Sequence, residues 1–185
     1  MALLATGLHV VVQLVKKLTT SPVIEWHPVV HVRNFRDSED IQSWLRLRTD
    51  VFAKTAVPVR PWSASDFERQ FLRKSWWNPT RMWLAETVDT TQLVGAVTLA
   101  DRGRGDQPAV HWLMVQSAWR RRGVGRLLMS QLESFCWQLG WRQVQLESVT
   151  EWEAALDFYR SMGCLLYTSD AADEGLGVDL GGRRI

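Results

Sequence analysis

The stretch WRRRGVGRLL, residues 119–128, combines the residue types that bind anions. Arginines at positions 120–122 supply charged donors, and Gly123 and Gly125 let the backbone approach a bulky anion without an intervening side chain. Where such a turn opens a helix, unpaired N–H groups and the helix dipole favour a phosphate. From these residues alone, a phosphate site and a solvated basic turn both remain open.

The spacing excludes two other phosphate motifs. A Walker loop needs Gly-Lys-Ser/Thr after its glycines, and none follows here. A dinucleotide fingerprint needs glycine at the position of Leu128. Nucleic-acid binding calls for basic residues spread along a face with aromatic residues between them, whereas these arginines are clustered and the net charge is only +2. We therefore expect no nucleic-acid partner.

The elements that must position this turn lie on both sides of it. An apolar strand is predicted over 110–115, and helical spacing of apolar residues predicts a helix over 124–139 that ends at Gly140. Alternating residues predict a strand over 144–149, and Thr150 with Glu153 reads as a capping box for a helix that ends at Gly163. The segment 110–149 is thus a parallel strand–helix–strand crossover.

The preceding segment supplies the rest of one sheet. We predict a strand at 29–34, a helix over about 37–52 capped by Asp37 or Ser38, and a second helix over 65–74 opened by Ser65 and Glu68. Strands at 82–88 and 93–100 read as a hairpin, and DRGRGDQP (101–108) reads as a loop. The order is β-α-α-β-β-β-α-β-α, an α/β protein with a mixed sheet and helices on it.

Two motifs in this order resemble the GNAT superfamily of N-acetyltransferases. The pattern Arg120-x-x-Gly123-x-Gly125 after a strand is similar to that family's acyl-CoA signature. QLESVTEWEAALDFYRSMG (145–163) is similar to its second hallmark, a Leu-Glu strand and a helix that ends in Tyr-x-x-x-Gly. The resemblance implies the acyl-CoA N-acyltransferase fold over residues 29–163, with two further strands that the chain lacks after Gly163.

The resemblance also implies a site for acetyl-CoA as cosubstrate, without a metal. Main-chain groups of strand 110–115 would pair with the pantetheine arm where two strands splay apart, and N–H groups of 121–126 would hold the pyrophosphate. The implied cofactor-binding residues are Leu113, Met114, Val115, Arg120, Arg121, Arg122, Gly123, Val124, Gly125 and Arg126.

The resemblance implies two catalytic residues. Tyr159 would protonate the departing thiolate, since a phenol with a pKa near about 10 is protonated at neutral pH. Glu147 would take the proton from the amine, with Glu86, His111 or a water as alternatives. A core tyrosine, a solvent-facing strand carboxylate and a structural histidine are the corresponding non-catalytic interpretations. Trp152 stands where the family commonly has an asparagine that reaches the cofactor.

These observations predict an acetyl-CoA-dependent N-acetyltransferase that acts by direct attack on a primary amine of a small molecule or protein. The alternative is a non-catalytic acyl-CoA binding or sensing module of the same fold. Aromatic residues flank the second predicted helix, and core packing is favoured over an acceptor-pocket role for them: Trp62, Trp76 and Trp77. Two cysteines are too few for a disulfide framework, which favours a reducing cytoplasm. We expect a monomer or homodimer.

The chain ends are predicted to lie outside this domain. Residues 1–28 are interpreted as an N-terminal extension. The apolar run 2–15 is too short to span a bilayer as a helix, so we expect no membrane partner. Residues 164–185 (CLLYTSDAADEGLGVDLGGRRI) resemble a translated sequencing adapter and are set apart as non-native. Without the two last strands, the sheet is expected to have a bare apolar edge and the chain to be poorly soluble.

Overall fold

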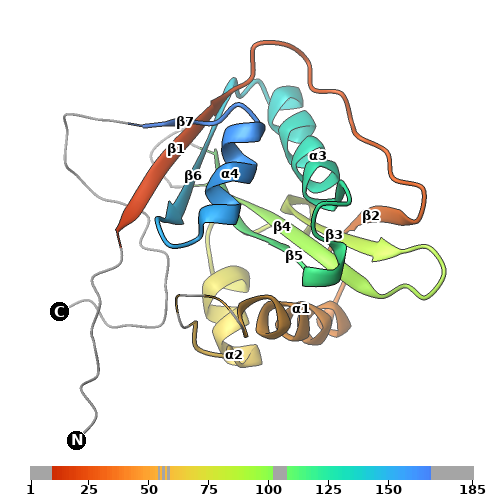
Figure 1. The fold of residues 1–185 in the computed structure, drawn as a ribbon. Coiled ribbons are helices and arrows are strands. Elements are labelled where there is room, and N and C mark those ends of the chain that lie inside the picture. Colours follow the sequence, from red (N-terminus) through yellow and green to blue (C-terminus); the bar gives the residue numbers. More distant parts are fainter. Residues whose placement is uncertain (1–9, 54, 56, 58, 102–107, 168–185) are drawn as a thin grey trace, which may run out of the picture.

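A computed structural model describes residues 10–167 apart from 54, 56, 58 and 102–107. Within these residues, one seven-stranded sheet has the order β2-β3-β4-β5-β6-β1-β7, and Figure 1 shows α1 and α2 on one face and α3 and α4 on the other. The strands are β1 (Val11–Lys17), β2 (Val30–Asn34), β3 (Met82–Thr87), β4 (Leu93–Asp101), β5 (Pro108–Val115), β6 (Gln143–Val149) and β7 (Leu165–Leu166). The helices are α1 (Ser38–Phe52), α2 (Ala64–Phe67), α3 (Val124–Gln138) and α4 (Glu153–Ser161).

The predicted fold class is confirmed. The sheet is mixed, because β5 and β6 run parallel while the other neighbouring strands are antiparallel. The crossover from β5 through α3 to β6 explains the parallel pair, since a helix must carry the chain back across the sheet. Asp37 caps α1 as expected, where its carboxylate accepts a hydrogen bond from the Glu39 N–H at 2.9 Å.

Both predicted capping boxes are wrong. The box that opens α2 is formed by Ser63 and Asp66, two residues before the predicted pair, and α2 continues as a π-helical turn over Glu68–Leu72. At the start of α4 the N-cap is Trp152, whose side chain makes no capping bond. The Thr150 hydroxyl donates to the neighbouring Glu151 carboxylate at 3.0 Å, and Thr150 lies two residues before the N-cap position, so it does not cap the helix.

The N-terminal segment contributes a strand that the sequence did not predict. β1 pairs with β6 along its whole length, from Val11 opposite Val149 to Lys17 opposite Gln143. Leu14 in this strand is only 1% exposed, so part of the predicted extension belongs to the core. The expectation of a bare edge is therefore wrong for β6, because β1 covers it.

β7 is the outermost strand and pairs with Leu14 and Val15 of β1. These two strands occupy the side of β6 where the family resemblance implies two later strands. Residues 102–107, which fall in the predicted loop, the first nine residues and residues 168–185 lie outside the described part of the chain. The interpretation of the tail as adapter sequence therefore stays a prediction.

Two hydrophobic cores lie on the two faces of the sheet. The first packs under α3 and α4 and includes Leu128, Leu132 and Leu146. The second packs under α1 and α2 and is aromatic, with the Trp44 and Phe71 side chains fully buried. Among the described residues, no helix combines the length and the apolar character that crossing a bilayer requires.

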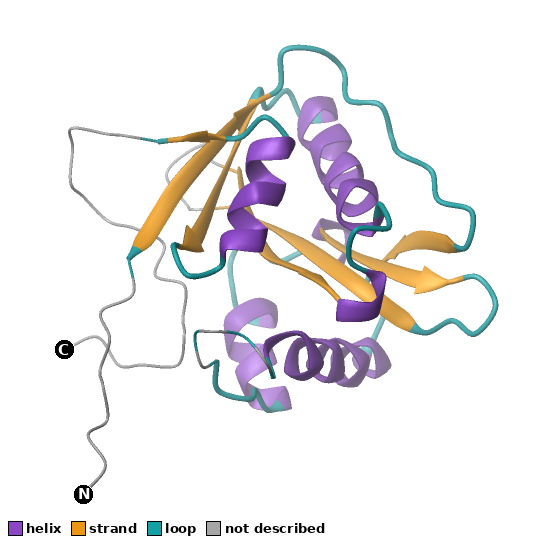
Figure 2. Cartoon of the chain, viewed as in Figure 1, coloured by secondary structure: helices purple, strands orange, loops and turns teal. Residues whose placement is uncertain are grey.

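The loop between β1 and β2 runs along α3, as Figure 2 shows in teal. The Glu25 N–H donates to the hydroxyl of Ser130 in α3 at 2.9 Å, and the His27 ring lies beside the turn that precedes α3. This loop therefore brings the N-terminal segment to the predicted phosphate turn.

Candidate functional site

β5 and β6 separate immediately after they meet. Within the described residues their ladder contains one pair, Ala109 opposite Gln145. The β4–β5 register shifts between Ala96 and Thr98, and Trp112 opposite this shift has φ +55°. A non-glycine residue in the left-handed region is uncommon and strained, and bulges often re-aim a strand beside a functional site. The predicted splay of two parallel strands is thus present.

The splay opens into a cleft of about 860 Å³, a size typical of small-molecule sites. Its walls come from the end of α1, the outer half of β5, the turn before α3, β6 and α4. All of the predicted site residues line it except Arg122 and Val124. The predicted residues that line the cleft are Leu113, Met114, Val115, Arg120, Arg121, Gly123, Gly125, Arg126, Glu147 and Tyr159.

The start of α3 is built to receive an anion. The first hydrogen bond of the helix runs from the Leu127 N–H to the Gly123 oxygen at 2.9 Å, so the N–H groups of 124–126 precede the helical ladder. Gly123 caps the helix without a side chain, and the first turn contains no acidic residue. The helix dipole adds partial positive charge at this end. Unpaired donors of this kind at a helix start are a typical site for phosphate groups.

The two positions in the turn require glycine for different structural reasons. Gly123 has φ +90°, a conformation that side-chain-bearing residues rarely adopt. At Gly125 an added Cβ would lie 3.2 Å from the Phe158 ring of α4, so glycine permits the close approach of α3 and α4. Val124 between them is fully buried in the core, and only its main chain lies at the turn.

The four arginines of the turn play different parts. Arg120 Nε donates to the Val115 oxygen at 3.1 Å, and Arg126 donates to the Ser161 hydroxyl at 3.1 Å near the end of α4. The Arg122 guanidinium lies 5.5 Å from the centre of the Trp119 ring. Arg121 is exposed at the cleft and has φ +62°. Two of the four guanidinium groups, those of Arg120 and Arg126, thus donate to protein acceptors.

Tyr159 and Glu147 line the same cleft and come from two different elements, α4 and β6. Tyr159 lies on α4 and is 7% exposed; burial raises the pKa of its phenol well above the ordinary value, so the hydroxyl remains protonated. Glu147 lies half-buried on β6, and Gln13 of β1 donates to its carboxylate at 3.4 Å. A protonated phenol and a carboxylate in one cleft can serve as acid and base.

The two alternative bases lie in different surroundings. Glu86 of β3 accepts a hydrogen bond from Arg33 Nε at 3.0 Å and does not line the cleft. His111 does line the cleft, and its ring packs 5.5 Å from the Phe71 ring and 5.8 Å from the Trp112 ring. The geometry thus keeps Glu147 and His111 as candidates and assigns Glu86 to an ion pair.

Three aromatic residues that sequence reasoning did not place together line the cleft next to one another: Phe52 of α1, Trp112 of β5 and Trp152 at the start of α4. The Phe52 ring lies 5.6 Å from that of Trp112 and 5.3 Å from that of Trp152. We call these three residues the aromatic wall. They come from distant parts of the sequence, so no local motif identifies them.

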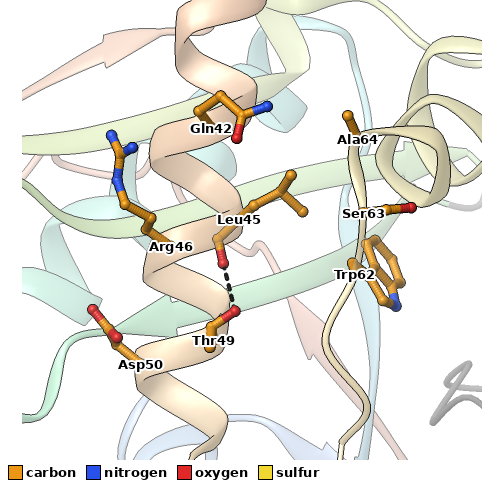
Figure 3. A pocket seen from close by; sticks show the side chains of 8 residues that line it. All are labelled: Gln42, Leu45, Arg46, Thr49, Asp50, Trp62, Ser63 and Ala64. Atoms are coloured by element: carbon orange, nitrogen blue, oxygen red, sulfur yellow. Dashed lines mark hydrogen bonds between the residues drawn. The ribbon is translucent and has the colours of Figure 1, made fainter.

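The tryptophans near the second predicted helix do not line this cleft. As favoured from the sequence, they pack in the second core: Trp62, Trp76 and Trp77. Trp62 also borders a smaller hollow of about 300 Å³ between α1 and the segment before α2, shown in Figure 3. Arg46 and Asp50 on its rim are exposed, and none of the predicted catalytic or cofactor-binding residues lies there.

A mixed sheet that splays beside a glycine-rich helix start is the arrangement that the resemblance to the N-acetyltransferase fold implies. Residues 41–164, more than half of the chain, match the family model described as "Acetyltransferase (GNAT) family". The chain therefore belongs to the GNAT acetyltransferase family.

Several solved structures share the fold of this chain. A GCN5-related N-acetyltransferase from Sphaerobacter thermophilus has a TM-score of 0.71 at 19% identity, with 85% of this chain and 48% of that chain covered. The ribosomal-protein-S18-alanine N-acetyltransferase from Escherichia coli has a TM-score of 0.56 at 16% identity, with 72% and 76% covered. The NatC complex bound to Gag peptide and CoA has a TM-score of 0.58 at 20% identity, with 72% and 83% covered.

A curated relative is similar in sequence. An uncharacterized protein of Mycobacterium leprae (strain TN) is 33% identical over 104 residues, which are 56% of this chain and 27% of that protein. This chain thus spans only part of the length of the Mycobacterium protein and about half that of the Sphaerobacter enzyme. Within the described residues, no group of three or more His, Cys, Asp or Glu side chains is placed to hold a metal ion.

Proposed function

We propose that this protein is an acetyl-CoA-dependent N-acetyltransferase that transfers the acetyl group directly to a primary amine. The observation that carries the proposal is a single cleft lined by the start of α3, which no side chain caps, and by Glu147 and Tyr159. Family membership and the CoA in the related NatC structure support the choice of cosubstrate.

Binding would use the main chain first. The N–H groups of residues 121–126 would hold the pyrophosphate, with Arg121 adding charge at the mouth. The pantetheine arm would extend along Leu113, Met114 and Val115, where β5 has left β6. The Val115 oxygen already accepts a hydrogen bond from Arg120, so the arm would rely on the remaining main-chain groups of β5.

The chemistry then requires one base and one acid. Glu147 takes a proton from the substrate ammonium, directly or through water, and the freed nitrogen attacks the thioester carbonyl carbon. The C–N bond forms and the C–S bond breaks, and the departing thiolate takes the Tyr159 proton. The nitrogen, cationic after the attack, gives its second proton through water to the Tyr159 phenolate, and Glu147 returns its proton to solvent. The products are an amide and CoA with a free thiol. The raised pKa of Tyr159 suits this role, since the phenol keeps its proton until the thiolate forms.

The second candidate function is a non-catalytic acyl-CoA binding or sensing module. Trp152, at the place of the family's common asparagine, favours it, because an indole cannot copy the hydrogen bonds of an amide. Such a module would bind acetyl-CoA through the same turn and release no thiol in the presence of amines.

Thiol release from acetyl-CoA, measured together with the mass of the acetylated amine, separates these functions. We expect turnover in the wild type and large losses in Tyr159→Phe and Glu147→Gln. Tyr167→Phe is the matched control, because Tyr167 is the other tyrosine of the chain and lies exposed beyond β7. Saturable acetyl-CoA binding without thiol release from any amine would identify the binding module instead.

A further inference from the structure

We propose that the acceptor of this enzyme is a small primary amine attached to a flat aromatic group. This inference rests on the proposed function and adds the substrate class. It comes from the aromatic wall (Phe52, Trp112 and Trp152), which lines the same cleft as Glu147.

The wall is held rigidly from behind. Arg48, only 1% exposed, places its guanidinium 4.8 Å from the centre of the Trp112 ring and 4.3 Å from that of Trp62. The Trp62 ring in turn meets the Trp112 ring edge to face at 5.3 Å. Such packing fixes the ring planes before any ligand arrives, and preorganised rings lose little entropy on binding.

The aromatic wall exposes only apolar atoms of its side chains to the cleft. Trp112 and Trp152 are each half-buried, while both indole nitrogens are fully enclosed and have no hydrogen-bond partner among the described residues. What either indole exposes is therefore hydrocarbon. Phe52, also half-buried, adds no polar atom. A surface of this kind contacts an aromatic ring well and offers nothing to the hydroxyl groups of a sugar or the amides of a peptide.

The carboxylates of the cleft suit a cationic acceptor. Glu147 supplies one from β6, and Glu151, Glu153 and Asp157 supply others before and along α4. The arginines that line the cleft, Arg120, Arg121 and Arg126, all belong to the turn and the start of α3 rather than to this wall. An amine with an aryl group on a short linker places its nitrogen at Glu147 and its ring on the wall.

Steady-state kinetics with paired amines tests this inference on the full chain. Phenethylamine and n-butylamine share a primary amine and differ in the aromatic ring; spermidine, glucosamine and a short peptide with a free N-terminus represent the other acceptor classes. We expect kcat/KM for phenethylamine to exceed that of each other amine by at least about tenfold. In Trp152→Ala and in Phe52→Leu, the ratio of phenethylamine to butylamine should fall toward one.

Trp26→Ala serves as the control, because Trp26 is 80% exposed and lies outside the cleft, so the ratio should stay as in the wild type. Acetyl-CoA affinity in each variant reports whether the fold is retained. Equal or better turnover of butylamine, spermidine, glucosamine or the peptide in the wild type overturns the aromatic acceptor and leaves the proposed function standing. Turnover of no amine at all overturns both.

Discussion

His27 Nε2 lies 2.9 Å from the main-chain oxygen of Arg122, so the N-terminal segment contacts the turn in front of α3. The Val29 N–H donates to the other ring nitrogen, Nδ1, at 3.3 Å. Nδ1 is therefore the acceptor, and Nε2 carries the proton that it donates to Arg122. Through this bond His27 fixes the turn whose N–H groups form the proposed pyrophosphate site.

Replacing His27 with alanine is expected to raise KM for acetyl-CoA by about threefold to tenfold while kcat changes little. The reason is that a typical hydrogen bond contributes roughly 0.5–1.5 kcal/mol, and this one orients the turn without touching the reacting atoms. His31→Ala is the control, since His31 lies 3.5 Å from Glu86 and away from the cleft. An unchanged KM in His27→Ala would show that the turn holds its shape unaided.

Gly123→Ala and Gly140→Ala form a matched pair. Both glycines have positive φ, +90° and +83°, so alanine at either position should lower the free energy of unfolding by about 1 kcal/mol. Denaturant unfolding measures this loss. Only Gly123 lies at the start of α3, so only Gly123→Ala should also weaken acetyl-CoA binding. Equal binding by the two variants would argue against the turn as the anion site.

Tyr159→Phe is expected to lower kcat by about 100-fold or more and to leave acetyl-CoA affinity nearly unchanged. The pKa of the buried phenol lies above its ordinary value of 10, so the acid keeps its proton throughout the usual assay range. The wild-type pH–rate profile should therefore show no alkaline loss from this group below about pH 10. A loss smaller than about threefold in Tyr159→Phe would remove the tyrosine from the mechanism.

Leu14→Ala tests whether β1 is integral to the sheet. Leu14 is 1% exposed, and truncating a buried leucine costs about 2–5 kcal/mol of unfolding free energy. Val10→Ala, at a residue 60% exposed, should change little. Deletion of residues 1–18 should go further and produce insoluble protein, because the β6 edge loses its partner. A soluble deletion variant with an unchanged unfolding midpoint would contradict the register of β1 on β6.

The two cysteines should be unreactive in the native protein. Burial raises the pKa of the Cys136 thiol to about 12 and that of Cys164 to about 11, against 9.0 for a free thiol. Alkylation at about pH 8 should therefore be slow until the chain is unfolded. Because both values are raised, this part of the stability is present below about pH 9 and is lost as the pH rises toward 11 and 12. Rapid native-state labelling would contradict the burial of both thiols.

Most elements between residues 29 and 163 could be predicted, because their signals are local. The apolar residues of α3 recur on one face, and β6 alternates along its length. β1 could not be predicted, because its partner β6 lies far along the chain and no local pattern in VVQLVKK indicates which strand it pairs with. The capping box of α2 was misplaced because two candidate serines lie close together; the structure uses Ser63, next to the buried Trp62.

In the candidate site, too, the residues that form a local sequence motif could be predicted, and those that meet only in the folded chain could not. The turn before α3 was located because its glycines and arginines are contiguous. The aromatic wall was not, because Phe52, Trp112 and Trp152 come from three separate elements and meet only when the sheet is formed. His27 was assigned to an extension because its contact with Arg122 depends on the path of the β1–β2 loop along α3.

Calorimetric titration of acetyl-CoA into the full chain tests the central claim most directly. The account predicts one saturable site, weaker binding as salt is raised, and weaker binding in Arg121→Ala and Gly123→Ala than in the wild type. Arg46→Ala is the control, because Arg46 is an exposed arginine at the separate hollow of Figure 3. Absence of saturable binding, or binding that the turn variants leave unchanged, would contradict the cleft between β5 and β6 as an acetyl-CoA site.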